Sequence, residues 1–300
     1  MPTYIDHQVK LKDGRTIGYA EYGHPQGKPI LHFHGTPSSR LEGNCYNNLN
    51  EVATSLEIRL IFPDRPGIGL SDFKPHRTLL DWADDVAELA DCLDIAQFAV
   101  IGLSGGVPHA LACAYKIPHR LTQVGLIGGI SPLDKSDIFQ DMSNSNKLQI
   151  TIARKAPWLL RFIFGLVSRD FRKNPDSAIA QLTNELSEPD KAVFARSNFK
   201  ASFIQMIHEA FRSGTRGVAE DQTIIARGWG FKLDQIDVKT YLWHGEMDTL
   251  CSINMGRYLA GAIPNCSARF LSKEGHISLY VNYYKEILTT LISSEESNRN

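Results

Sequence analysis

One serine of this chain lies in a setting that suits nucleophilic chemistry. Ser104 occupies the pattern Gly102-x-Ser104-x-Gly106, directly after the apolar run 98–103 and directly before small residues with helical spacing. A strand, a tight turn and a helix in that order form a nucleophile elbow, which holds the serine in a strained backbone conformation. Side chains at the two glycines would collide with the neighbouring strand and helix. Ser104 is therefore the candidate nucleophile, and Gly102 and Gly106 support its turn.

A serine hydroxyl is a poor nucleophile unless a nearby base takes its proton. In such sites the base is a histidine that an acid holds in the correct tautomer. The chain contains ten histidines, and His276 is the one that lies after the last predicted strand and before the final predicted helix. Because functional groups collect at the carboxyl ends of parallel strands, we predict that His276 is the base.

The predicted acid is Asp248, which lies just past the seventh predicted strand. Ser104, Asp248 and His276 then follow the chain order serine, acid, histidine that accompanies a nucleophile elbow. Two other carboxylates remain open for the acid role. Glu246 lies two residues before Asp248, and Asp134 follows the sixth predicted strand.

Acyl transfer also needs donors for the negative oxygen that develops during attack. These donors are expected at the residue after the nucleophile and in the loop after the third strand, where Gly105 and Thr36 lie. Gly35 lets the backbone turn so that it presents the N–H of Thr36. We interpret His34 as a histidine that holds this loop, with a role as catalytic base as the alternative.

The elements that must position these residues alternate along the first part of the chain. Apolar runs typical of strands are separated by stretches with helical spacing, and a Gly-x-Ser-x-Gly turn joins one strand to the helix after it. This alternation predicts a parallel α/β sheet with helices on both faces. The predicted strands cover 3–11, 15–22, 30–34, 59–62, 98–103 and 123–127, and the predicted helices cover 40–56, 79–95 and 106–117.

The alternation stops after the sixth predicted strand. Residues 131–230 show helical and irregular patterns with no convincing strand, and strand signals return at 238–243 and 267–271. The pattern therefore predicts a sheet domain whose two parts, 1–130 and 231–300, flank a helical insertion.

These motifs resemble those of the α/β-hydrolase fold family, and the resemblance covers essentially the whole chain. The family motifs appear here in order as the His34-Gly35 turn, the segment 64–71, the elbow around Ser104, Gly245-x-x-Asp248 and Gly275-His276. The resemblance implies an α/β fold: an eight-stranded, mostly parallel sheet flanked by helices, with a helical cap inserted after strand six. It also implies a serine nucleophile.

The resemblance implies a hydrolase of a small ester, thioester, lactone or amide. Ser104 would attack the carbonyl, His276 would move the proton, and Asp248 would orient the imidazole. A carbon–carbon bond hydrolase or an aminopeptidase of the same fold remains open. A protein of another class, which binds a ligand in the same fold without turnover, also remains open because fold alone does not establish activity.

Composition excludes several other classes. The formal net charge of −1 argues against a nucleic-acid-binding surface. Five cysteines without a Cys-x-x-Cys pair are typical of reduced thiols in a reducing compartment. With no signal-like N-terminus and no run of membrane-spanning length, we expect a cytoplasmic protein without a membrane span. We expect no cofactor and no metal, and a small acyl substrate as the ligand; a homodimer stays open.

Several other residues receive structural interpretations. After the fourth predicted strand, Asp64, Arg65 and Asp72 are expected to pair within their own loop. Cys251 and Cys266 are expected to be small buried hydrophobic residues.

The segment 157–167 has two interpretations. It is either a lid helix that lines an acyl pocket or touches lipid, or a cap helix packed on its neighbours with solvated arginines. We favour the second, because Arg161 interrupts the apolar run. Four further residues of the insertion either line the pocket or hold the insertion together: Phe199, Phe203, Met206 and Trp229.

Overall fold

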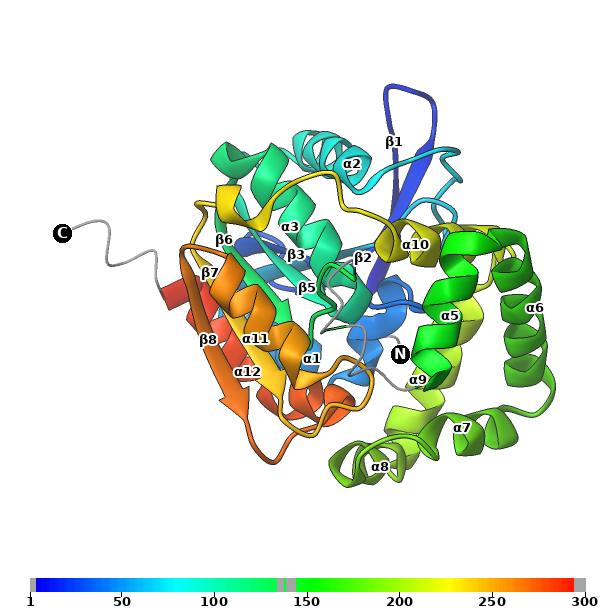
Figure 1. Cartoon of the computed structure of the whole chain (residues 1–300). Helices are drawn as coiled ribbons and strands as arrows, with labels where there is room; N and C mark the ends of the chain where they lie inside the picture. The colour runs from blue at the N-terminus through cyan, green and yellow to red at the C-terminus, as the bar shows by residue number, and fades with distance from the viewer. Residues whose placement is uncertain (1–3, 134–137, 139–143, 294–300) are drawn as a thin grey trace.

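The computed structural model describes residues 4–133, 138 and 144–293. Its centre is an eight-stranded sheet with the order β1-β2-β4-β3-β5-β6-β7-β8, shown in Figure 1. The β1–β2 and β2–β4 pairs are antiparallel, and the other neighbouring pairs are parallel. The predicted eight-stranded, mostly parallel sheet is therefore confirmed. Its strands are β1 (Ile5–Lys10), β2 (Thr16–Gly23), β3 (Lys28–Phe33), β4 (Ile58–Pro63), β5 (Phe98–Leu103), β6 (Leu121–Ile127), β7 (Thr240–Gly245) and β8 (Cys266–Leu271).

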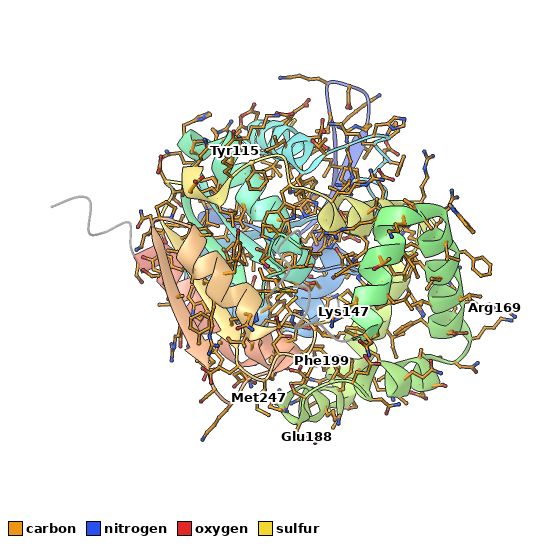
Figure 2. All side chains as sticks on the ribbon, viewed as in Figure 1. Tyr115, Lys147, Arg169, Glu188, Phe199 and Met247 are labelled. Atoms are coloured by element: carbon orange, nitrogen blue, oxygen red, sulfur yellow. The ribbon has the colours of Figure 1, made fainter. Side chains whose placement is uncertain are left out.

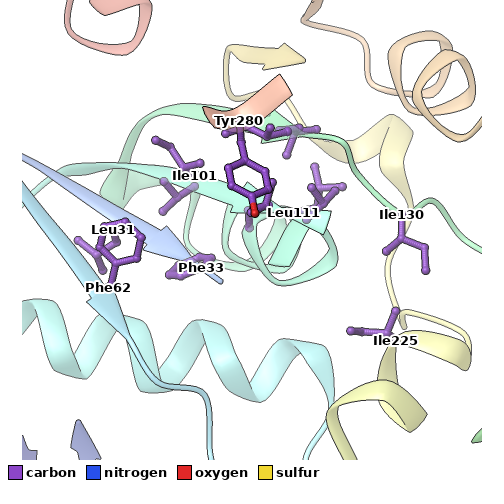
Figure 3. Close-up of a cluster of buried hydrophobic side chains, with 14 of the residues drawn as sticks. Leu31, Phe33, Phe62, Ile101, Leu111, Ile130, Ile225 and Tyr280 are labelled. Carbon is purple, nitrogen blue, oxygen red and sulfur yellow. The ribbon is translucent and has the colours of Figure 1, made fainter. Parts of the chain in front are cut away.

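The central strands are apolar on both faces because helices cover both sides of the sheet. Every residue of β5 is buried, as a parallel strand between two helical layers requires. In Figure 3, Leu31 of β3, Phe62 of β4 and Ile101 of β5 lie close together in this core. The edge strand β1 instead alternates between exposed and half-buried side chains.

Five helices flank the sheet in the described part of the chain outside the β6–β7 interval. In Figure 1, α11 lies in front of β7 and β8, and α12 lies behind them. α2 begins with a capping box, in which Thr78 and Asp81 satisfy each other's backbone N–H groups. These helices are α1 (Leu49–Ser55), α2 (Leu79–Cys92), α3 (Val107–Lys116), α11 (Ile253–Ala262) and α12 (His276–Ser293).

The single helix predicted over 40–56 is wrong. A short 3₁₀ helix, η1 (Arg40–Cys45), is separated from α1 by an extended Tyr46 and by Asn48, whose φ is +51°. Tyr46 leaves the helical path because its ring packs in the core, with its centroid 4.0 Å from that of Tyr284 on α12. Burial of this aromatic ring therefore outweighs the local helical preference.

Between β6 and β7, the described residues form helices and no strand. We call this group the cap helices: α5 (Asn144–Lys155), α6 (Pro157–Lys173), α7 (Pro175–Thr183), α8 (Glu188–Phe194), α9 (Ser197–Ala210) and α10 (Arg216–Ala226). They lie together to one side of the sheet (Figure 1). We propose 131–230 as the cap and 1–130 with 231–300 as the core. The ends of this division remain a prediction, because 134–137 and 139–143 lie outside the described residues.

The cap helices are held together by aromatic side chains. The rings of Phe199 and Phe203 on α9 both contact Phe194 of α8, with centroids 5.1 Å and 5.0 Å apart. Met206 faces the core instead, where its sulfur accepts a hydrogen bond from Ser38. Trp229 is buried and donates to a carbonyl oxygen at the end of α10. Phe199, Phe203 and Trp229 therefore hold the cap helices together, whereas Met206 joins α9 to the core.

Candidate active site

Ser104 occupies the turn between β5 and α3 with a φ of +52°, a conformation that costs energy for a residue with a side chain. The flanking glycines are required by space. A Cβ at Gly102 would lie 2.7 Å from the carbonyl oxygen of Gly106, and a Cβ at Gly106 would lie 2.0 Å from that of Phe33. The local geometry is therefore that of the predicted elbow.

His276 and Asp248 meet beside this elbow. His276 is the first residue of α12, and its Nδ1 lies 2.7 Å from Asp248 Oδ2 in the turn after β7. The other carboxylate oxygen, Oδ1, accepts the backbone N–H groups of Leu250 and Cys251, each at 2.8 Å. Both side chains are buried. These two N–H groups fix the carboxylate so that Oδ2 points at the imidazole.

The charge of Asp248 governs the titration of the imidazole. Burial by itself lowers the pKa of His276, but the charge and hydrogen bond of Asp248 outweigh it, with help from Asp190 and Glu42. The net effect raises the pKa of His276 above its ordinary value of 6.5. An imidazolium that forms at this position is therefore stabilised.

The competing acids differ in their placement. Glu246 is exposed to solvent and takes no part in an ion pair found among the described residues. Asp134 lies outside the described residues. A second histidine, His244, is buried with its Nε2 3.6 Å from Asp248 Oδ2 and 2.9 Å from the Cys251 carbonyl oxygen. Burial lowers the pKa of His244, which keeps it neutral beside the His276–Asp248 pair.

Ser104 lies beside Cys251: burial and Asp248 raise the pKa of the Cys251 thiol, and the Ser104 hydroxyl acts in the opposite direction. Among the described residues, no direct hydrogen bond joins the Ser104 hydroxyl to His276, whose Nδ1 is engaged by Asp248. Such bonds often tighten only when substrate is bound. Gly128, at φ +50°, faces the same space, since a Cβ there would lie 3.3 Å from His276 Nδ1. The need for a glycine at this position has no local signature in the sequence.

The predicted oxyanion residues are neighbours. A Cβ at Gly105 would lie 2.7 Å from Thr36 Oγ1, so the two backbone segments approach closely. His34 is fully buried and donates from Nδ1 to the Gly35 carbonyl oxygen at 2.8 Å, while its Nε2 accepts the Arg65 N–H at 3.4 Å. Burial, reinforced by Arg65, lowers the pKa of His34 well below its usual range. The imidazole of His34 is thus neutral and hydrogen-bonded at both ring nitrogens, which supports the interpretation of His34 as a loop-holding residue.

The expected pairing within the loop after β4 is wrong. Asp64 bonds Arg40, through its backbone N–H at 2.7 Å and its guanidinium at 2.9 Å. Asp72 accepts the backbone N–H of Thr16. Arg65 points into the protein, where a buried guanidinium needs a carboxylate partner, and the loop's own acids are already engaged elsewhere.

The partner of Arg65 is Asp221 on α10. Both side chains are fully buried, and Arg65 Nη2 lies 2.8 Å from Asp221 Oδ2. Asp221 also accepts from Arg77 at 2.7 Å and from the hydroxyl of Thr36 at 2.7 Å. Burial alone raises the pKa of Asp221, but Arg65, His109 and Arg77 hold it well below its usual range. A cap carboxylate therefore fixes the loop that carries Thr36.

A second cap carboxylate holds the other half of the site. Asp190 of α8 is fully buried, and its two oxygens accept the first three N–H groups of α12, from His276, Ile277 and Ser278, at 2.8–2.9 Å. These N–H groups have no partner within the helix and carry its positive dipole end. Gly275 is packed against this contact, since a Cβ there would lie 2.4 Å from Asp190 Oδ2. Asp190 therefore caps the helix that begins with His276.

A cavity of about 330 Å³ opens onto Ser104 and Gly105. Its apolar wall includes Ile130 and Ile225, which lie near each other in Figure 3. The cap helices and the turn between α7 and α8 add a polar wall, formed by Asn146, Gln149, Gln181, Glu185 and Gln222. The volume is at the small end of the range for ligand sites. The described lining contains no lysine or arginine.

Cys251 is buried as expected, whereas Cys266 is only half-buried because β8 is an edge strand.

Within the described ranges, no cluster of three or more His, Cys, Asp or Glu side chains is arranged to hold a metal ion. No helix in those ranges is long and apolar enough to cross a bilayer.

Replacement of Asp190 by Asn should lower the pKa of His276 by up to about one unit, because a negative charge near the imidazolium is lost. NMR titration of the His276 ring in both proteins measures this shift. Glu188→Gln is the matched control, since this exposed carboxylate lies on the same helix and pairs with the exposed Lys191. An unchanged His276 pKa in a folded Asp190→Asn protein would contradict the assignment.

Replacement of Asp221 by Asn leaves Arg65 and Arg77 with buried positive charge. We expect the free energy of unfolding to fall by about 3–5 kcal/mol, as measured by urea denaturation. The control is Glu21→Gln, which breaks the partly exposed pair with Arg59 and should cost less than about 1 kcal/mol. Equal losses of unfolding free energy in the two variants would show that the buried Asp221 cluster stabilises the fold no more than an exposed ion pair does.

Comparisons with known proteins find relatives and structural neighbours that are named as hydrolases and peptidases. A 2-hydroxymuconate semialdehyde hydrolase of Pseudomonas putida is 24% identical over 88% of this chain and 87% of its own length. A proline iminopeptidase of Xylella fastidiosa is 30% identical over 42% of this chain. The chain spans only about two fifths of the length of the first such relatives, 40% in this case. The esterase RhEst1 of Rhodococcus has the same fold, with a TM-score of 0.66 and 19% identity over 97% of this chain and 99% of its own.

A family model described as the alpha/beta hydrolase fold matches residues 28–283. That span includes the elbow, the Asp248 turn, His276 and all the cap helices. The fold, the order of the site residues and this match agree: the chain belongs to the alpha/beta hydrolase fold family.

Proposed function

We propose that this protein is a serine hydrolase that cleaves a small ester, thioester, lactone or amide through an acyl-enzyme on Ser104. The observation that supports it most directly is the 2.7 Å hydrogen bond between His276 Nδ1 and Asp248 Oδ2 beside the elbow. With Nδ1 engaged, Nε2 is the ring nitrogen left to accept the serine proton. The hydrolase and esterase names of relatives and structural neighbours support the same class.

In the proposed reaction, Ser104 Oγ attacks the substrate carbonyl while its proton passes to His276 Nε2. The tetrahedral oxyanion accepts hydrogen bonds from the backbone N–H groups of Gly105 and Thr36. The bond to the leaving group then breaks, and His276 gives its proton to the departing oxygen, sulfur or nitrogen. Water attacks the acyl-serine, with His276 as the base, and the acid and free Ser104 are released.

The cavity supports a small substrate with a polar acyl group. Its volume of about 330 Å³ leaves little room for a long chain, and the amide groups of Gln149, Gln181 and Gln222 offer both donors and acceptors. A carbon–carbon hydrolase that takes a muconate-type substrate must bind a carboxylate. Because the described lining has no basic side chain, it favours an ester over such an anion.

Ser104→Ala should lower kcat/KM for a short-chain p-nitrophenyl ester by about three orders of magnitude or more, since no other group replaces the nucleophile. Asp248→Asn should cause a loss of roughly similar size, whereas Glu246→Gln should change it by less than about twofold. Fluorophosphonate should label wild type and not Ser104→Ala. Full activity in Ser104→Ala would move the nucleophile elsewhere. Failure to label folded wild type would favour a non-catalytic ligand-binding protein.

Cleavage of aminoacyl esters or amides is the second candidate. Glu185 is the carboxylate in the described lining of the cavity, and it accepts a hydrogen bond from Ser145 at 2.8 Å. A carboxylate at this position could pair with a substrate ammonium. If this candidate is right, a free aminoacyl ester should be preferred over its N-acetyl analogue. Glu185→Gln should reduce that preference by about fivefold, and the exposed Glu188→Gln should not. Equal rates for the two substrates in wild type would exclude it.

A further inference from the structure

The outer face of α6 carries apolar side chains that nothing in the described structure covers. Trp158, Phe162 and Leu166 are 74%, 62% and 47% exposed. They are half of the six large hydrophobic side chains exposed in the described ranges. Their spacing of four residues places them on one face of the helix. Leu148 of the neighbouring α5 is also exposed, at 61%.

The opposite face of α6 already satisfies the packing of the cap. Leu160, Phe164 and Phe171 are buried against the other cap helices. The sequence suggested that Arg161 interrupts a single apolar face. The helix instead has two apolar faces, an inner one and an outer one. The preferred interpretation of 157–167 as a helix packed on its neighbours accounts for the inner face alone.

The segment that carries this face is also strongly basic. Residues 155–173 contain five basic side chains and one acidic side chain, a local charge of +4 in a chain whose total is −1. Arg169 lies in the same stripe as Trp158 and Phe162, and Figure 2 shows it pointing outward from α6 at the rim of the molecule. None of the ion pairs found among the described residues involves Lys155, Arg161 or Arg169.

We propose that α6 docks the protein on an anionic lipid surface, lying in the plane of the interface. Aromatic and leucine side chains beside arginine and lysine on an exposed helix face form the pattern of an interfacial helix. The apolar side chains would insert at the boundary between the lipid headgroups and the acyl chains, and the lysine and arginine side chains would pair with lipid phosphates. α6 does not span the bilayer, because it is neither long nor apolar enough.

The placement of α6 suits this role. It is the outermost of the cap helices in Figure 1, on the side away from β8. It packs against α5, whose other residues Asn146, Gln149 and Ile150 line the cavity. Docking through α6 therefore brings the cap to the membrane without covering Ser104. The inference does not depend on the proposed hydrolase activity.

Trp158 is a built-in reporter. The other three tryptophans, Trp82, Trp229 and Trp243, are at most 5% exposed, so the solvent-sensitive emission comes from Trp158. With vesicles of phosphatidylcholine containing about 30 mol % phosphatidylglycerol, we expect a blue shift and protection from acrylamide. Co-sedimentation should show binding about tenfold or more tighter than to pure phosphatidylcholine, and salt should weaken it.

Variants separate the two contributions. The combined change Phe162→Ser and Leu166→Ser, and separately Arg161→Gln with Arg169→Gln, should each weaken binding by about tenfold or more. Ile5→Ser, at an exposed apolar side chain on β1, is the control and should bind as wild type does. Circular dichroism verifies that each variant folds.

Three results would overturn the proposal. The first is no binding of folded wild type to anionic vesicles at low salt. The second is binding without any change in Trp158 emission. The third is a doubling of mass in light scattering that Phe162→Ser abolishes, which would assign this face to a second copy of the chain.

Discussion

The fully buried ion pair between Arg65 and Asp221 joins two parts of the chain that are 156 residues apart. One partner lies in the loop after β4 and the other on the cap helix α10. Because the pair is desolvated, each charge depends on the other, and Thr36 adds its hydroxyl to the same carboxylate. The loop that carries a candidate oxyanion donor is therefore tied directly to α10.

Asp190 provides a second connection of the same kind. Its carboxylate accepts the N–H groups that a capping residue would normally accept at the start of α12. A residue of α8 therefore fixes the backbone position of His276. From the other side, the turn after β7 fixes Asp248 through two N–H groups. The cap helices are thus part of the scaffold of the candidate site, in addition to forming a wall of its cavity.

The cap helices also divide their surfaces by chemistry. α5 faces the cavity with amide groups that can bind a polar acyl group, while α6 turns aromatic and basic side chains outward. This difference follows from position: the inner helix borders the candidate nucleophile, and the outer helix borders solvent. In the proposed roles, α5 would thus contact the substrate and α6 would contact the lipid.

The sequence alone determined the features that rest on local spacing. The apolar runs of β3 to β8 and the strained Gly-x-Ser-x-Gly turn are encoded over a few residues each, and the chain order of Ser104, Asp248 and His276 follows from where strands end. Even the space requirement of Gly106 could be predicted, because it arises from the adjacent strand.

Only the tertiary structure decided the long-range contacts. Nothing near Arg65 in the sequence indicates that its partner is Asp221, and nothing near His276 points to Asp190, because burial selects a partner across space and leaves no periodic signal. The same reason explains the broken helix at Tyr46 and the two apolar faces of α6. Periodicity predicts which residues share a helix face, whereas which of those faces is covered depends on the packing of the whole cap.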